Sequence, residues 1–135
     1  MRIPRAAVPK KPGDGVLLSL AKFMRVLRID PLARVAVVQP GVRNSAISEA
    51  VAHLGLYYAP DPSSQIACTI GGNIAENAGG KTAVLWGTAI DNILAYTIAM
   101  PGQDLLTVQR INHPMRKILP DDTLHFQVVD SHKKV

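Results

Sequence analysis

One stretch, residues 60–80, constrains what this chain can fold into more than any other part of it. It reads PDPSSQIACTIGGNIAENAGG and holds two glycine pairs, Gly71-Gly72 and Gly79-Gly80. Because glycine has no Cβ, the backbone can turn sharply and a ligand can approach closely at both pairs. The run between the pairs, residues 73–78, is compatible with a short helix. The stretch therefore predicts a glycine-lined loop from which a helix starts.

No lysine or arginine occurs from residue 44 to residue 80, although the chain carries a net charge of +5. An anion bound in this stretch would have to rely on backbone N–H groups and on the positive end of a helix dipole. Asn73 and Asn77 can add amide groups that orient the backbone or a ligand by hydrogen bonding.

Three interpretations of the stretch stay open on spacing alone, and the first is favoured. It is a plain glycine turn followed by a glycine-capped helix. The second is a P-loop, because Gly80-Lys81-Thr82 is similar to the end of that motif; its first glycine would fall on Ala75, however, and no suitable strand directly precedes it. The third is a different dinucleotide cradle, since the Rossmann pattern G-x-G-x-x-G is absent.

Length and composition indicate one globular domain. A chain of 135 residues, 47% of them hydrophobic, can bury a single core. No apolar run approaches the ~18 residues that span a bilayer, and the proline-rich N-terminus does not read as a secretory signal. The single cysteine, Cys68, fits a reducing, cytoplasmic location. Its apolar neighbours Ile66, Ala67 and Ile70 predict a small buried thiol.

Basic residues gather at the two ends of the chain and around a predicted hairpin. Aromatic residues make up only 4% of the chain and do not interleave with the basic ones, as binding of single-stranded nucleic acid would require. We therefore expect solvated basic flanks and no nucleic-acid partner.

The first half of the chain predicts a hairpin and a helix. Residues 1–14 read as an irregular lead-in, and residues 16–20 as a short buried strand. The β-branched segments 25–30 and 34–39 flank a proline turn and predict a hairpin. Asn44 is then the expected N-cap of a helix. That helix carries an apolar stripe, ends at Gly55 and places His53 on the surface; the stripe consists of Ile47, Ala50, Val51 and Leu54.

The second half predicts another hairpin and one further strand. A brief strand is expected at residues 56–59. Residues 92–100 and 104–108 flank Pro101-Gly102, which suits a type II turn. Residues 124–129 predict a strand in the tail. The tail also carries three histidines at no spacing typical of metal ligands, so we expect surface histidines and no metal site; they are His113, His125 and His132.

Residues 15–108 resemble the FAD-binding domain of the FAD-linked oxidases, the PCMH-type family. The segment VQPGVRNSAISEAVAHLGLYYAPDPSSQIACTIGGNIAENAGG carries the resemblance, together with residues 21–23 and 25–31. Within the family, the chain resembles the FAD-binding subunit of bacterial glycolate oxidase and its D-lactate dehydrogenase relatives. The resemblance implies an α+β fold of β-hairpins with short packing helices, against which FAD lies extended.

The resemblance also implies cofactor contacts and a reaction class. The reaction is the two-electron oxidation of a 2-hydroxy acid, with hydride transfer to the flavin. No catalytic residue is assigned. The implied cofactor-binding residues are Pro60, Asp61, Pro62 and Ser63 on the flavin-side path, Thr69, Gly71, Gly72 and Asn73 at the pyrophosphate and ribityl region, Asn77, Gly79 and Gly80 in the next loop, and Ile98 near the cofactor.

Three departures from the family limit this transfer. The family has an early glycine-rich loop of the type Arg-Gly-x-Gly-Thr, whereas residues 6–11 read AAVPKK. After Gly80 the family has a histidine and a basic residue before Tyr-Gly, whereas residues 82–87 read TAVLWG. Past residue 108 the likeness fades into a divergent tail, residues 109–135, where the family continues towards a substrate-binding cap domain.

We therefore expect a partial FAD-binding domain of a glycolate-oxidase-type flavoprotein, with reduced FAD affinity and no catalysis by this chain alone. The chain would be a truncated product or a fragment that needs partner subunits of an oxidase complex. A 2-hydroxy acid substrate would require the cap domain. The alternative is a non-enzymatic basic binding module that keeps the fold but has lost the flavin.

Overall fold

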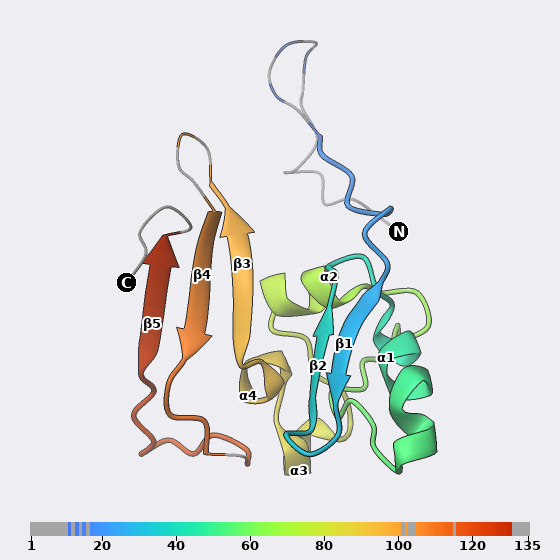
Figure 1. Cartoon of the computed structure of the whole chain (residues 1–135), viewed down its shortest axis with the longest axis vertical. Helices are drawn as coiled ribbons and strands as arrows, with labels where there is room; N and C mark the ends of the chain where they lie inside the picture. Colours follow the sequence, from blue (N-terminus) through green and yellow to red (C-terminus); the bar gives the residue numbers. More distant parts are fainter. Residues whose placement is uncertain are drawn as a thin grey trace.

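A computed structural model of the chain describes residues 11, 13, 15, 17–100, 102, 105–114 and 116–130. It confirms a mixed α+β architecture, with two small antiparallel sheets and short helices (Figure 1). The elements in chain order are β1 (Val26–Asp30), β2 (Val35–Val38), α1 (Asn44–Val51), the 3-10 helix η2 (Ala52–Leu54), α2 (Ile70–Ala75), α3 (Ala83–Trp86), α4 (Ala89–Asn92), β3 (Ala95–Ala99), β4 (Leu105–Arg110) and β5 (Phe126–Asp130).

β1 and β2 form the first expected hairpin, paired antiparallel. Their β-branched residues favour the extended backbone, and the proline between them cannot continue a strand. In the turn, the Ala33 N–H donates to Asp30 Oδ1 at 3.0 Å. Arg34 closes the turn in the left-handed region, with a φ of 54°.

The core lies between this hairpin, α1 and α2. Val42, Ile47 and Ile70 are buried there. Ile47 and Val51 come from the predicted stripe of α1, whereas Leu54 at its end is 37% exposed. The partly buried side chains packed around the core are Val26, Ala36, Val38, Ala46, Tyr58 and Ile74.

The two ends of the helical segment 44–54 differ in how well the sequence predicted them. The prediction of Asn44 as N-cap was wrong, because Arg43 is the N-cap and Asn44 is the first helical residue. The Asn44 side chain is buried and donates to the Pro60 carbonyl at 2.9 Å, so it does not cap the helix. At the other end, Gly55 closes η2 in the left-handed conformation as predicted. His53 is exposed there, which confirms its surface position.

β3, β4 and β5 form an antiparallel sheet in that order. The β3–β4 pair confirms the second predicted hairpin, and Gly102 in its turn has a φ of 70°. Pro101 lies outside the described residues. β5 confirms the strand predicted in the tail over residues 124–129.

Two predicted strands are absent from the described residues. Residues 17–20 form no strand, because this segment leaves the body of the molecule beyond β1 (Figure 1); Leu18 is 77% exposed. Residues 56–59 are also irregular. There the Tyr58 N–H donates to Ser48 Oγ at 3.0 Å, so a side chain of α1 replaces a strand partner.

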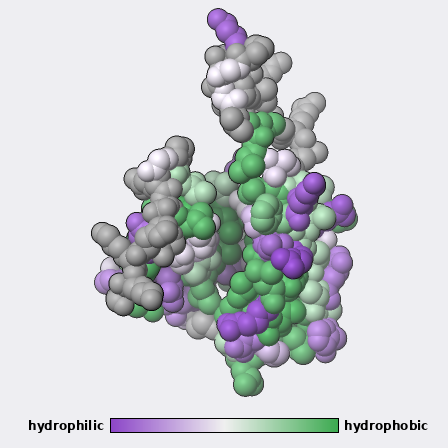
Figure 2. Space-filling model, turned by 45° about the horizontal axis from the view of Figure 1, so that its top comes forward, coloured by the Kyte–Doolittle hydropathy of each residue, from purple (hydrophilic) through white to green (hydrophobic). Residues whose placement is uncertain are grey.

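Large apolar side chains remain exposed over much of the described surface. Leu32 is 98% exposed and Val84 is 83% exposed. Figure 2 shows hydrophobic residues spread across one face of the molecule. Among the described residues, no helix is both long and apolar enough to cross a membrane.

Candidate functional site

The glycine-rich stretch forms a helix, but that helix starts earlier than the sequence predicted. α2 has Thr69 as its N-cap. Gly71 and Gly72 therefore lie inside its first turn, and the prediction that they precede the helix was wrong. Glycine has a low intrinsic helix propensity, so tertiary contacts must set this start.

Backbone pairing with the segment before α1 sets the start of α2. Arg43 and Thr69 form an antiparallel bridge, and the Ile70 N–H donates to the Val42 carbonyl at 2.8 Å. The bridge also brings an arginine to the start of α2. From the sequence, Arg43 is one of the solvated basic residues around the predicted hairpin, since a single sequence does not reveal the pairing of residue 43 with residue 69.

Gly71 is the point of closest approach between these two segments. Its N–H donates to the Pro40 carbonyl at 2.9 Å. A Cβ on Gly71 would lie 3.0 Å from the Pro40 Cβ. A side chain at this position would therefore push the two segments apart, so Gly71 is a packing residue.

Gly72 offers an N–H group that could bind a ligand. Among the described residues this N–H has no carbonyl partner, whereas its neighbours in the first turn donate to the carbonyls of residues 40, 42 and 69. A Cβ on Gly72 would meet only the Thr69 Oγ1, at 3.7 Å. Open space beside an unpartnered N–H at a helix start suits a phosphate oxygen. The sequence predicted several free backbone N–H groups at this helix start, but among the described residues of the first turn only the Gly72 N–H lacks a carbonyl partner.

Asn73 is the second sign of a ligand in the stretch. It is only 3% exposed, and its Nδ2 has no hydrogen-bond partner among the described residues. Its backbone is fully bonded, since the N–H donates to the Thr69 carbonyl and the carbonyl accepts from Ala78. A buried donor without a partner costs about 1–3 kcal/mol. A polar ligand atom at Nδ2 would remove that cost.

Asp61 and Gly80 are brought into contact by the fold. A Cβ on Gly80 would overlap the Asp61 carbonyl, so the loop accepts only glycine there. The Thr82 N–H donates to Asp61 Oδ1 at 3.0 Å, and the Thr82 hydroxyl lies 2.6 Å from the same oxygen. These hydrogen bonds from Thr82 hold the pKa of Asp61 below its usual value. The ionised carboxylate thus anchors the start of α3.

The remaining residues of the corner at 60–63 have mixed exposure. Pro60 is fully buried and its carbonyl accepts the Asn44 amide. The Pro62 carbonyl accepts from the Gln65 N–H at 2.8 Å, which starts a tight turn. Ser63 is exposed on that turn.

Cys68 follows the same turn and is half-buried. Ile66 is 72% exposed and Ala67 is exposed as well. The prediction of a thiol buried among these neighbours was therefore wrong, because the tight turn directs them outward.

Asn77 and Gly79 shape the loop between α2 and α3. Asn77 adopts a left-handed conformation, with a φ of 49°. Its Oδ1 accepts from the Thr88 hydroxyl at 2.8 Å and from the Ile90 N–H at 2.9 Å. A Cβ on Gly79 would lie 2.9 Å from Thr88 Cγ2. Both residues hold the loop against the start of α4.

Ile98 is the predicted site residue that lies outside the glycine-rich stretch. It is half-buried in β3, opposite Leu106 of β4. The other predicted residues all lie between Pro60 and Gly80.

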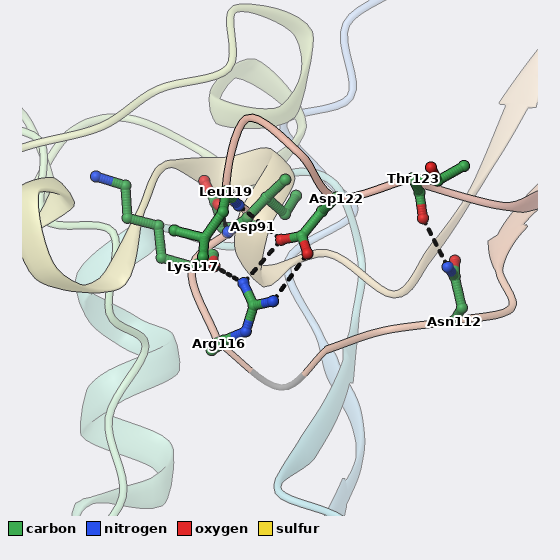
Figure 3. Close-up of polar contacts among 8 residues, drawn as sticks. Asp91, Asn112, Arg116, Lys117, Leu119, Asp122 and Thr123 are labelled. Atoms are coloured by element: carbon green, nitrogen blue, oxygen red, sulfur yellow. Dashed lines mark hydrogen bonds and ion pairs between the residues drawn. The ribbon is translucent and has the colours of Figure 1, made fainter.

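Asp91 joins the tail of the chain to α4. Its Oδ1 accepts from the Ile118 N–H at 2.6 Å, while its Oδ2 accepts from Thr88 in a capping box. Burial raises the pKa of Asp91, but the hydrogen bonds from Ile118 and Thr88 together outweigh it and leave the pKa below its usual value. Figure 3 shows the tail loop at this point, with Arg116 bonded to both oxygens of Asp122.

The tail histidines are not all surface residues. His113 is half-buried with its Nε2 2.9 Å from the Asp91 carbonyl, so the surface prediction was wrong for it. Burial and the charge of Arg110 lower the pKa of His113. His125 is exposed as predicted, and His132 lies outside the described residues. Within the described part of the chain, no group of three or more histidine, cysteine or acidic residues could hold a metal.

Comparison with known families identifies the class of protein to which this chain belongs. The FAD binding domain family matches residues 5–109. The chain therefore belongs to the FAD binding domain family. The match confirms the resemblance to FAD-linked oxidases and FAD as the cofactor of the family.

Relatives similar in sequence to this chain include glycolate oxidase subunits and a D-lactate dehydrogenase. The chain is 55% identical over 94 residues to the glycolate oxidase subunit GlcD of Escherichia coli (strain K12), covering 70% of this chain and 19% of that protein. The subunit GlcD of Bacillus subtilis (strain 168) is 40% identical over 96 residues, covering 70% of this chain and 20% of that protein. The D-lactate dehydrogenase of Anaerostipes hadrus is 37% identical over 94 residues, with the same coverages of 70% and 20%.

The matches with these relatives are partial. The chain spans about a fifth of the length of the curated relatives it matches. No solved structure matches the chain.

Proposed function

We propose that this chain supplies the FAD-binding part of a flavin-dependent 2-hydroxy-acid oxidoreductase and does not catalyse the oxidation by itself. Its relatives named glycolate oxidase and D-lactate dehydrogenase support the reaction class. The match of the FAD binding domain family over residues 5–109 supports a cofactor-binding role, with residues 15–108 as the binding part. When bound, FAD would accept the hydride of the substrate.

Two donors of α2 support the proposal most directly. The Gly72 N–H would donate to a phosphate oxygen of FAD, because it lacks a carbonyl partner and the space beside it is open. The Asn73 Nδ2 would donate to a second polar atom of the cofactor, because it is buried without a partner. Arg43, beside the start of α2, would offset the phosphate charge.

The other proposed cofactor residues would shape the binding surface rather than donate to FAD. Several of them already serve the fold, as Asp61, Asn77 and Gly80 show. The full proposed set around Gly72 and Asn73 comprises Pro60, Asp61, Pro62, Ser63, Thr69, Gly71, Asn77, Gly79, Gly80 and Ile98.

The cysteine count and the name of one relative support a location and partners. The single cysteine supports a reducing compartment, and we place the protein in the cytoplasm on that ground. The name of the glycolate oxidase subunit supports partner subunits, with a 2-hydroxy acid bound only in such an assembly.

The test is binding of FAD to the purified chain. We expect FAD to stay with the protein after gel filtration, with a shifted visible spectrum and quenched fluorescence. Gly72→Ala would weaken FAD binding about 10-fold to 100-fold, because the new Cβ blocks one charge-assisted hydrogen bond. Ala75→Ser, an exposed change at the other end of α2, is the matched control and would bind as the native chain does.

Two results would count against the proposal. One is a folded chain, judged by circular dichroism, that elutes without flavin at every FAD concentration tried. The other is equal loss of affinity in the Gly72 and Ala75 variants, because that would separate FAD binding from the start of α2.

A further inference from the structure

A cavity of about 210 Å³ lies between α4 and the second sheet. Its walls are mostly apolar, with side chains from α4, the following loop and one face of the sheet, and with Ile74 of α2 and the polar Asn77 just after it. Tyr96 and Val108 are directly paired across β3 and β4, and Arg110 and Phe126 are paired across β4 and β5, so these four share that face. Among the lining residues, Arg110 provides the cationic group.

Arg110 is buried without enough partners. It is 5% exposed. Its Nη2 donates to the Ile90 carbonyl, and its guanidinium carbon lies 5.5 Å from the centre of the Phe126 ring. Its Nε and Nη1 have no hydrogen-bond partner among the described residues. A guanidinium stays charged in proteins, and unpaired donors on a buried charge are costly.

The charge of Asp91, next to the lining residue Ile90, favours the ionised guanidinium of Arg110, but Asp91 makes no hydrogen bond to it. Asp91 uses both its oxygens on Ile118 and Thr88. Arg110 forms no ion pair with any carboxylate in the described part of the chain. The cavity therefore presents a buried cation with two free donors inside an apolar wall.

The size and lining of the cavity restrict the ligand. Pockets for drug-sized ligands usually measure about 300–1,000 Å³, so this cavity of about 210 Å³ suits something smaller than a dinucleotide. A phosphate dianion usually has several donors around it, whereas one guanidinium suits a monoanion. The apolar wall requires an apolar body on that anion.

We propose that this cavity binds a small organic carboxylate with an apolar body. Its carboxylate would accept hydrogen bonds from Arg110, and its body would pack against Ile93, Leu94 and the neighbouring apolar wall. Asn77 lines this cavity and also belongs to the proposed cofactor set, whereas the two proposed FAD donors, Gly72 and Asn73, do not line it. The test below therefore uses the flavin-free chain and includes a competition with FAD.

The test titrates the flavin-free chain with phenylacetate and follows the arginine Nε–H signals by NMR. Arg110→Lys identifies the Arg110 signal by its loss. We expect that signal to shift saturably with phenylacetate. Benzyl alcohol, which has a similar body without the charge, would bind at least about 10-fold more weakly, and inorganic phosphate would leave the signal unchanged.

Variants give a second readout. Arg110→Gln would lower phenylacetate affinity at least about 10-fold. Arg28→Gln, at an exposed arginine of β1, is the matched control and would bind as the native chain does. If Arg110→Gln does not fold, the titration of the native chain decides alone.

Three outcomes would overturn the proposal. The first is that the Arg110 Nε–H signal does not shift saturably with phenylacetate. Water would then be the partner of the Arg110 donors. The second is equal affinity for benzyl alcohol, because the carboxylate would then play no part. The third is displacement of phenylacetate by stoichiometric FAD, which would assign Arg110 to the cofactor site.

Discussion

The Asp61 carbonyl occupies the space in which a side chain on Gly80 would lie. This contact ties the proline corner to the end of the glycine-rich stretch. Thr82, two residues further on, then hydrogen-bonds the Asp61 carboxylate. The absence of a side chain at Gly80 is thus explained by the close packing of two backbone segments, without any need for a ligand there.

Gly80→Ala is expected to destabilise the chain. The new Cβ would force the Asp61 backbone aside, at a cost of about 1–3 kcal/mol typical of overpacking. Urea unfolding followed by circular dichroism measures this. Gly72→Ala is the control, since its Cβ would meet only Thr69 Oγ1 at 3.7 Å. It would be neutral or stabilising by up to about 1 kcal/mol. Equal destabilisation by both changes would refute the contact.

Two buried asparagines are expected to respond oppositely to the same substitution. Asn44→Leu removes the donor to the Pro60 carbonyl and would cost about 1–3 kcal/mol. Asn73→Leu removes an amide Nδ2 that has no partner among the described residues, so its effect on the flavin-free chain would be near zero or stabilising. Thermal unfolding of both variants without FAD compares them directly. A large loss of stability in Asn73→Leu would show that its amide is bonded in the free protein.

Asp91→Asn is expected to loosen the tail from α4. Hydrogen bonds to a charged group contribute about 1.5–3 kcal/mol, and the substitution weakens those from Ile118 and Thr88. Because the folded-state pKa of Asp91 is lowered, its contribution is present above the unfolded pKa of about 3.9 and is lost as the pH falls below it.

The measurement for Asp91 is urea unfolding at a series of pH values. The stability difference between the native chain and Asp91→Asn would shrink below pH 4. Asp121→Asn, at an exposed position nearby, is the control and would change stability by less than about 0.5 kcal/mol. A difference that stays constant across this pH range would mean that the charge of Asp91 plays no part.

Tyr58 is expected to make the chain unstable in strong alkali. Burial, together with the charge of Cys68, raises the pKa of Tyr58 to about 12. The unfolded chain ionises near pH 10, so the contribution of Tyr58 is intact below pH 10 and is lost as the pH rises towards 12. Absorbance at 295 nm would show a late step that disappears in Tyr58→Phe. Tyr57→Phe is the control, and loss of the same step there would contradict the assignment.

Local patterns predicted the two hairpins, α1 and the strand in the tail, but not α3 or α4. The two hairpins follow from β-branched segments around proline and glycine turns, and α1 follows from its apolar stripe. The family was also readable, because the segment from Val38 to Gly80 is long and specific. These features depend on residues close together in the sequence.

The errors in and around the starts of α1 and α2 come from contacts between distant residues. Asn44 appeared to be a cap, but its amide bonds the Pro60 carbonyl instead. Gly71 was expected to precede a helix, but it lies in the first turn of α2, where its N–H donates to the Pro40 carbonyl. The bridge between Arg43 and Thr69 was not predicted, because the whole of α1 separates the two residues in the sequence. Each error is a tertiary contact that overrides a local preference.

The pairing of residues 40–45 with residues 65–71 links the first turns of α1 and α2. The Asn44 and Ser45 N–H groups donate to the carbonyls of residues 68 and 65, while the Gly71 N–H donates back to residue 40. Neither helix start can open without breaking bonds of the other. Their amide protons are therefore expected to exchange with solvent as one cooperative unit. A cofactor held at Gly72 would then slow exchange at Ser45, a residue of the other helix.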